Sequence, residues 1–290
     1  MSSSPNIKVL VTGATGFIGR ALVENLKGRS GFSVRGAARR PGKDLPVGVE
    51  SVQVADLSPE TDWQVAVTGM NVVVHTVAHV HVTQDTAPDP LTEFRRVNVA
   101  GTLNLARQAA AAGVRRFVFL SSVKVNGEGW PSPSPMTPLP RSLCQRERGG
   151  YREKDSPGPQ DAYGISKHEA ELGLRGIAAE TGMEVVIIRP PLVYGPGVKA
   201  NFLNMMRWLC RGIPLPLGSI HNRRSLVALD NLVDFICVCL NHPAAANQTF
   251  LVSDGEDIST TDLLRRMAHE LHVPARLLPV PQGLLGWGAR

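Results

Sequence analysis

The sequence predicts an α/β protein whose larger part is a doubly wound parallel sheet, followed by a smaller C-terminal domain. Short apolar runs alternate with helical segments from Ile7 to Arg189, and a glycine-rich turn, Gly13–Gly19, directly follows the first run. Strands that are covered on both faces are apolar throughout, and their alternation with helices is typical of a parallel sheet. After Pro190 the alternation becomes irregular, which predicts a domain boundary there.

Each predicted strand is a buried apolar run, and the predicted helices lie between such runs. The first strand ends at a glycine, and the fourth contains three consecutive valines. We expect strands at Ile7–Thr12, Val34–Ala38, Val49–Ala55, Asn71–His75, Arg116–Ser121 and Glu184–Arg189, and helices at Phe17–Lys27, Asn98–Ala112 and Tyr163–Glu180.

Residues 1–190 are expected to form the first domain and residues 191–290 the smaller second domain. The chain stops at Arg290 soon after an apolar stretch, which is compatible with a second domain truncated at its C-terminus. Within the first domain, Gly127–Gln160 is rich in proline and charge. A connection of that length is either a functional lid or disordered, and the sequence leaves both open.

Composition limits the classes of function. The net charge is +6 but aromatic residues make up only 5%, and no nucleic-acid-binding motif accompanies the charge, so we expect no nucleic-acid partner. The four cysteines show no CxxC spacing, which is typical of a reducing compartment. Because neither a secretory signal nor an apolar run of membrane-spanning length is present, we expect a cytoplasmic protein without a membrane span.

The turn after the first strand has the features of a pyrophosphate site. Glycines allow a tight turn and a close approach of the backbone, and the N-terminus of the following helix supplies N–H donors and a positive dipole end. A glycine pattern between a strand and a helix is what a dinucleotide site requires. The expected cofactor contacts in the turn are Gly13, Thr15, Gly16, Phe17, Ile18 and Gly19.

The end of the second strand bears on the choice of cofactor. Dinucleotide sites often place an acid there to hold the ribose 2′-hydroxyl, whereas this chain has Arg39 and Arg40. A guanidinium matches the oxygens of a 2′-phosphate, so the sequence favours NADP(H), with NAD(H) as the alternative. Asp56 and Leu57, after the third strand, are expected on the adenine side.

Three residues form a candidate catalytic set. Tyr163 and Lys167 are four residues apart on a predicted helix and therefore share a face. A tyrosine with a pKa near 10 is a poor acid–base group at neutral pH, and a nearby ammonium would lower that pKa. Ser122 follows the fifth strand, where side chains point into the ligand crevice of such sheets.

Together these motifs resemble the extended short-chain dehydrogenase/reductase (NAD-dependent epimerase/dehydratase) family, whose larger domain is a Rossmann fold. The resemblance spans essentially the whole chain and includes Asn98–Thr102 and Arg189–Gly195. It implies that Tyr163 is the acid–base group, that Lys167 lowers its pKa and contacts the ribose, and that Ser122 orients the reacting oxygen.

The resemblance also implies a nucleotide-sugar substrate, bound largely by the second domain, and a homodimer that pairs through the helices at Asn98–Ala112 and Tyr163–Glu180. We expect no metal at His75, His79 and His81, because no carboxylate or cysteine partner accompanies them. The further cofactor contacts it implies are His75, Ala78, Asn98 and Pro190, and the substrate contacts are His79, Lys124, Asn201, Leu217 and Arg224.

Within the family, dehydratases carry an acid pair just after the strand-end hydroxyl, where this chain has Val123 and Lys124. A 4-keto reductase and a 4-epimerase remain. The missing second-strand acid and Asn126, at a position where epimerases commonly have tyrosine, favour a resemblance to bacterial UDP-4-keto-6-deoxy-N-acetylhexosamine 4-reductases of O-antigen and polysaccharide synthesis. The alternative is a UDP-sugar 4-epimerase that holds NAD tightly.

Overall fold

A computed structural model describes residues 6–40, 45–79, 89–127 and 150–280 and divides them between two compact units. The larger unit contains the chain up to Pro190 together with residues 233–252, and the smaller unit contains residues 191–232 and the chain from Ser253 onward. No helix in the described ranges is both long enough and apolar enough to cross a membrane.

The larger unit is built on a seven-stranded, wholly parallel sheet in the order β3-β2-β1-β4-β5-β6-β9. The order reverses between β1 and β4, and ligands of open parallel sheets bind at the carboxyl ends of strands where this happens. The strands are β1 (Ile7–Thr12), β2 (Phe32–Ala38), β3 (Glu50–Gln53), β4 (Val72–His75), β5 (Arg116–Leu120), β6 (Glu184–Arg189) and β9 (Thr249–Leu251).

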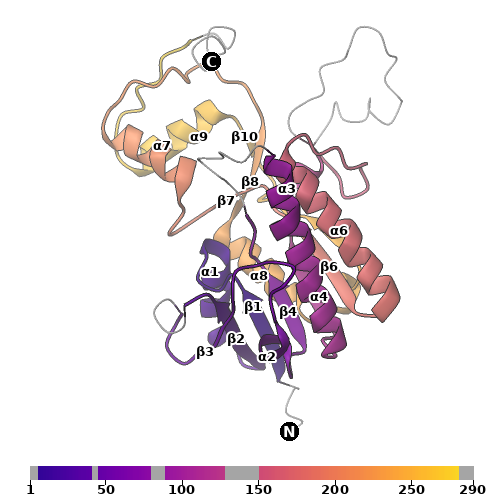
Figure 1. Ribbon diagram of the computed structural model, residues 1–290. Helices are drawn as coiled ribbons and strands as arrows, with labels where there is room; N and C mark the ends of the chain where they lie inside the picture. The colour runs from indigo at the N-terminus through magenta and orange to yellow at the C-terminus, as the bar shows by residue number, and fades with distance from the viewer. Residues whose placement is uncertain (1–5, 41–44, 80–88, 128–149, 281–290) are drawn as a thin grey trace, which may run out of the picture. The chain divides into compact units, whose positions relative to one another are not determined.

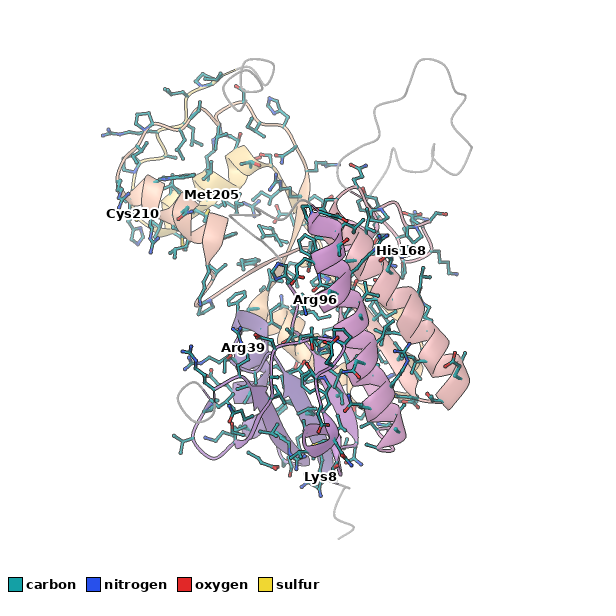
Figure 2. The ribbon with its side chains drawn as sticks, in the orientation of Figure 1. Lys8, Arg39, Arg96, His168, Met205 and Cys210 are labelled. Carbon is teal, nitrogen blue, oxygen red and sulfur yellow. The ribbon has the colours of Figure 1, made fainter. Side chains whose placement is uncertain are left out.

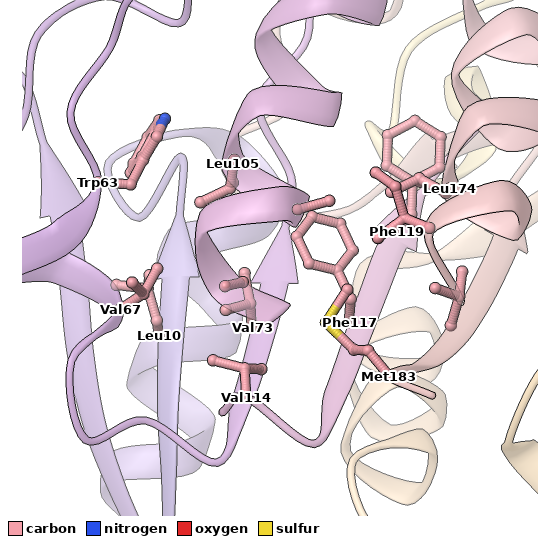
Figure 3. Close-up of a cluster of buried hydrophobic side chains, with 14 of the residues drawn as sticks. Leu10, Trp63, Val67, Val73, Leu105, Val114, Phe117, Phe119, Leu174 and Met183 are labelled. Atoms are coloured by element: carbon pink, nitrogen blue, oxygen red, sulfur yellow. The ribbon is translucent and has the colours of Figure 1, made fainter. Parts of the chain in front are cut away.

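Helices cover both faces of this sheet, as the continuous apolar strands require. On one face α4 and α6 run side by side (Figure 1). The side chains of Leu10, Val73 and Phe117 pack under them in one buried cluster (Figure 3). The helices of this unit are α1 (Phe17–Lys27), α2 (Gln64–Val67), α3 (Pro90–Phe94), α4 (Thr102–Ala111), α6 (Ala162–Thr181) and most of α8 (Leu229–Cys239).

The predicted fold class is confirmed, and the six predicted strands are present: β1 and β6 have the predicted ends, and the other four have shifted ends. The helix expected at Asn98–Ala112 starts earlier and has three parts: α3, a π-helical segment at Arg95–Gly101, and α4. π-Helical turns are rare and often mark functional sites, because they re-aim a side chain within a helix. Most of the proline-rich stretch, residues 128–149, lies outside the described residues.

One segment departs from the expected domain division. All of residues 191–290 were assigned to the second domain, whereas residues 233–252 pack with the larger unit. β9 pairs with the edge strand β6, and the buried guanidinium of Arg116 donates to the carbonyl oxygens of Cys239 (2.7 Å) and His242 (3.0 Å). The two Arg116 hydrogen bonds join positions 123 and 126 residues apart, and local sequence patterns do not reveal such contacts.

The smaller unit has a three-stranded sheet, β10-β8-β7, and two helices. Its core contains Phe202, Leu226, Leu264 and Met267. Its elements are β7 (Leu192–Tyr194), α7 (Ala200–Cys210), β8 (Arg224–Ala228), β10 (Asp257–Ile258) and α9 (Thr260–Glu270).

We expect the Phe117→Ala variant to lower the free energy of unfolding by about 3–5 kcal/mol, because the ring is fully buried in the main cluster and its loss leaves a cavity. Val65→Ala, at a side chain that is 73% exposed on α2, should change it by less than about 0.5 kcal/mol. Urea denaturation of both variants measures the difference. Equal effects would mean that this packing is wrong.

Candidate active site

The turn between β1 and α1 can close only with glycine. Gly13 has a φ of +73°, and a Cβ placed there would lie 2.6 Å from the Thr76 hydroxyl oxygen. A Cβ on Gly19 would lie 2.1 Å from the Gly13 carbonyl oxygen. Gly16, the N-cap of α1, makes no side-chain capping bond, so the backbone donors of the first helical turn face outward from the helix end. The turn therefore fits a pyrophosphate.

A cavity of about 550 Å³ opens beside this turn, within the range of cofactor sites. It lies at the carboxyl ends of β1, β2 and β4, where the strand order reverses. Its lining residues are Thr12, Gly13, Thr15, Gly16, Ala37, Ala38, Arg39, Val54, Ala55, Asp56, Leu57, Trp63, Thr76, Val77, Ala78, His79, Glu93, Arg96 and Val97. Of the expected cofactor contacts, the turn glycines Gly13 and Gly16, together with Thr15, Arg39, Asp56, Leu57 and Ala78, are in this set.

Arg39 and Asp56, which were expected to contact different parts of a cofactor, pair with each other. The guanidinium Nη1 of Arg39 lies 3.0 Å from Asp56 Oδ1, and both side chains are more than three-quarters exposed. An exposed pair of this kind contributes little stability, so each group can turn to a ligand. Arg40 is also exposed but does not line the cavity. Figure 2 labels Arg39 on the larger unit.

His75, which ends β4 as expected, is held between two hydroxyl groups. Its ring is fully buried, with Nδ1 2.7 Å from the Thr12 hydroxyl and Nε2 3.1 Å from the Thr102 hydroxyl. Burial, assisted by the nearby Lys167 ammonium, lowers the pKa of His75 to about 3, so the ring is neutral at neutral pH. The ring ties β1 to α4 and is absent from the cavity lining.

Three residues that line the cavity, Trp63, Glu93 and Arg96, belong to none of the sequence motifs described above. Trp63 is 1% exposed, and within the described ranges its buried indole Nε1 has no hydrogen-bond partner. Arg96 forms a bidentate pair with Glu93 one helical turn earlier, at 2.7 and 2.8 Å. Arg96 belongs to the π-helical segment, where a regular helical repeat predicts the wrong facing. The scarcity of tryptophan, with four in the chain, is the signal that could have drawn attention to Trp63.

Tyr163 and Lys167 share one side of α6. The helix starts directly after Asp161, whose Oδ1 accepts a hydrogen bond of 2.6 Å from the Gly164 amide. The Lys167 Nζ lies 6.0 Å from the centre of the Tyr163 ring. The same ammonium donates to the carbonyl oxygen of Leu120 at 2.8 Å and lies 4.4 Å above the Phe119 ring. The lysine thus connects α6 to the carboxyl end of β5.

The charge state of this pair differs from the expectation. Burial raises the pKa of Tyr163, and the Asp161 carboxylate raises it further. Burial also lowers the pKa of Lys167 to about 7, against the opposing influence of the Glu171 carboxylate. The expected lowering of the tyrosine pKa by the lysine is therefore not found here, because the ammonium bonds to Leu120 and is itself desolvated. Acid–base activity of Tyr163 needs a further positive charge nearby.

Ser122 and Lys124 are both engaged in local structure. Ser122 is the N-cap of a 3-10 turn at Val123–Val125, and its Oγ accepts from the Lys124 amide at 3.3 Å. Accepting one bond leaves the hydroxyl able to donate another. The Lys124 ammonium lies 2.5 Å from Asp161 Oδ2, so it supports the start of α6 beside Tyr163. The expected contact of Lys124 with the substrate stays a prediction.

Asn98 links the π-helical segment to α6. Its amide accepts from the His79 N–H at 2.8 Å and donates to the His79 carbonyl at 3.0 Å. It also donates to the Ser166 hydroxyl at 3.1 Å, and that hydroxyl donates to the Tyr163 carbonyl at 2.8 Å. Asn98 is 1% exposed and holds the backbone around the site, and its expected contact with the cofactor stays a prediction.

Three expected substrate residues belong to the smaller unit. Leu217 packs against that unit's core, and Arg224 is exposed at the start of β8. The side chain of Asn201 lies outside the described part of the structure. The substrate roles of all three therefore stay predictions.

Comparison with known proteins identifies the family. Residues 9–253 match the model of the NAD dependent epimerase/dehydratase family. The chain belongs to that family. It is thus an NAD-dependent enzyme of the short-chain dehydrogenase/reductase superfamily, and the resemblance drawn from its motifs is confirmed at this level.

The curated relatives include epimerases of sugar compounds and dihydroflavonol 4-reductases. A UDP-glucose 4-epimerase of Vibrio cholerae is 48% identical over 94% of this chain and 78% of its own length. An N-acetyl-alpha-D-glucosaminyl-diphospho-ditrans,octacis-undecaprenol 4-epimerase of Escherichia coli O157:H7 is 28% identical over 97% of this chain and 78% of its own length. The narrower resemblance to 4-reductases of O-antigen synthesis is not supported by these relatives.

A solved structure shares the whole fold. MoeE5 in complex with UDP-glucose and NAD is 25% identical, with a TM-score of 0.75 over 97% of this chain and 92% of that chain. The agreement extends over both units.

We expect Gly19→Ala to weaken NAD(H) binding at least tenfold, because its Cβ would collide with backbone at 2.1 Å and displace the phosphate turn. Gly28→Ala, at the other end of α1, has its nearest contact at 3.6 Å and serves as the control. Isothermal titration with NAD(H) and circular dichroism measure binding and folding. Unchanged affinity in a folded Gly19→Ala protein would contradict a cofactor site at this turn.

Proposed function

We propose that this protein is a nucleotide-sugar 4-epimerase that acts on a UDP-linked hexose. The observation that carries the proposal is the 48% identity to a UDP-glucose 4-epimerase over nearly the whole chain. The arrangement of Tyr163 and Lys167 on one side of α6, with Ser122 at the end of β5, supports it. The absence of an acid pair at Val123 and Lys124 argues against a dehydratase.

The chemistry of the chain's own residues follows from that assignment. NAD, when bound, supplies a reversible hydride acceptor at the sugar C4. Tyr163 removes the proton from the C4 hydroxyl and returns it to the same oxygen, so no proton is gained or lost overall. Ser122 donates a hydrogen bond to that oxygen and keeps it beside the phenol. The positive charge that Tyr163 needs comes from the Lys167 ammonium and the oxidised cofactor together.

The cofactor follows from the reaction. An epimerisation leaves the substrate neither oxidised nor reduced, so the cofactor does not need to be exchanged between turnovers. We infer NAD(H) as the bound form. The Asp56 carboxylate, which lies 3.0 Å from Arg39 Nη1, offers an acceptor for ribose hydroxyls. NADP(H) is the less favoured alternative.

A 4-keto reductase is the second candidate. It rests on the absence of an acid at the end of β2, where Ala38 is followed by Arg39. We also infer a homodimer through α4 and α6, for which the exposed Leu172 on α6 provides apolar surface. We infer a cytoplasmic location as well. The size in solution, measured by light scattering, tests the dimer.

We expect Tyr163→Phe to lower kcat for the interconversion of UDP-glucose and UDP-galactose by about 10²–10⁴-fold, since the variant lacks the proton-transferring hydroxyl. Chromatography of the nucleotide sugars measures the rate. Tyr194→Phe, which removes a phenol bonded to Asp254 in the smaller unit, is the matched control and should stay within a few-fold of the wild type. Full activity of Tyr163→Phe would exclude this mechanism.

The purified protein is expected to carry about one NAD per chain, because an epimerase has no need to release it. Mass spectrometry of the acid-released cofactor measures this. A protein purified without NAD that oxidises NADPH with a UDP-4-keto sugar would favour the reductase over the epimerase.

A further inference from the structure

Glu171 and Arg189 form a buried ion pair next to the elements that carry Ser122, Tyr163 and Lys167. The Arg189 guanidinium holds both carboxylate oxygens of Glu171, with Nε at 2.9 Å from Oε1 and Nη2 at 2.5 Å from Oε2. The two side chains are 2% and 0% exposed. Arg189 is the last residue of β6 and Glu171 lies within α6, so the pair joins a strand end to the helix that carries Tyr163 and Lys167.

The ion pair also bonds to Ser121, which directly precedes Ser122, and to Asn126, four residues after Ser122. The Ser121 hydroxyl donates to Glu171 Oε1 at 2.6 Å, and Arg189 Nη1 donates to Asn126 Oδ1 at 3.1 Å. Ser121 and Asn126 are 4% and 3% exposed. Ser121 directly precedes the catalytic serine, and Asn126 ends the short turn that follows it. The carboxylate and the guanidinium therefore hold the chain on both sides of Ser122.

The helix places Glu171 in line with the catalytic residues. Tyr163, Lys167 and Glu171 recur every four residues and lie on one stripe of α6. Burying an ion pair is costly, and replacing it by apolar side chains of similar volume is often neutral or stabilising. Stability alone does not explain why this stripe carries a charge, whereas control of geometry does.

We propose that Glu171 and Arg189 are positioning residues: their ion pair locks α6 to the carboxyl ends of β5 and β6 and sets the distance between Ser122 and the Tyr163–Lys167 pair. Both side chains are buried and bonded to protein groups, so we assign them a positioning role and not a catalytic one. The inference rests on the proposed function, since it assigns these three residues to one reaction.

The pair also sets the electrostatic environment of Lys167. The ammonium faces Tyr163 and Glu171 on its own helix, the Phe119 ring and Leu120 carbonyl of β5, and the neutral His75 of β4. Glu171 is the carboxylate that opposes desolvation and raises the pKa of Lys167. Removing its charge would leave Arg189 unbalanced and lower that pKa, so the ammonium would be lost at a lower pH.

The test compares Glu171 of α6, whose ion pair lies where β6 ends, with Glu184, which lies where β6 begins. Glu171→Gln should lower kcat about tenfold to a hundredfold at pH 8 with KM for UDP-glucose changed less than threefold, and should move the alkaline limb of kcat to lower pH. Glu184→Gln is the control. Glu184 pairs with the buried Arg116 at 2.7 Å where β5 and β6 begin, and its loss should lower the melting temperature without moving kcat or the pH profile.

A second readout needs no turnover. NMR titration of isotopically labelled lysine, with the Lys167 signal assigned by Lys167→Arg, should give a lower pKa in Glu171→Gln than in the wild type. If that variant does not fold, Ser121→Ala, which keeps both charges, should lower kcat several-fold with KM unchanged.

Unchanged kcat and an unchanged Lys167 pKa in folded Glu171→Gln would overturn the positioning role. So would a Ser121→Ala enzyme identical to the wild type, where that variant is the one tested. A wild type that does not act on UDP-sugars would instead overturn the proposed function, and the NMR titration would still decide whether Glu171 supports Lys167.

Discussion

The buried ammonium of Lys167 is the interaction on which the site depends. A charge with no access to water is stable only where fixed partners replace its hydration. Here the Leu120 carbonyl, the Phe119 ring and the Glu171 carboxylate do so from the sheet and from the helix. Because these partners come from different elements, the buried ammonium has all of them only when α6 is docked correctly on β5. Folding and acid–base competence are coupled in this way.

In the proposed function, the larger unit separates cofactor binding from proton transfer. Glycines at the end of β1 leave room for backbone to approach a phosphate, and the cavity beside them is lined from β1, β2, β4 and the π-helical segment. Tyr163 and Lys167 come from α6 instead. Asn98 connects the two regions, since its amide bonds both to the His79 backbone and to Ser166 beside Tyr163. A displacement on one side is therefore felt on the other.

Much of the site could be predicted from local patterns, and the remainder could not. The turn at Gly13–Gly19 and the spacing of Tyr163 and Lys167 depend on contacts within a few residues, so sequence spacing is sufficient to find them. The neighbours of the His75 ring could not be predicted, because an apolar strand followed by a histidine does not tell which side chains the ring meets. Its partners, Thr12 and Thr102, are 63 and 27 residues away.

The sequence by itself determined the parallel α/β architecture, the phosphate turn and the family, because each is written in short-range periodicity or in contiguous motifs. Only the tertiary structure decided that residues 233–252 return to the large sheet, that Arg39 meets Asp56, and that Glu171 and Arg189 lie buried together. It also decided that the pKa of Tyr163 is raised and not lowered. Burial and long-range pairing set these properties, and both exist only after distant segments have packed against one another.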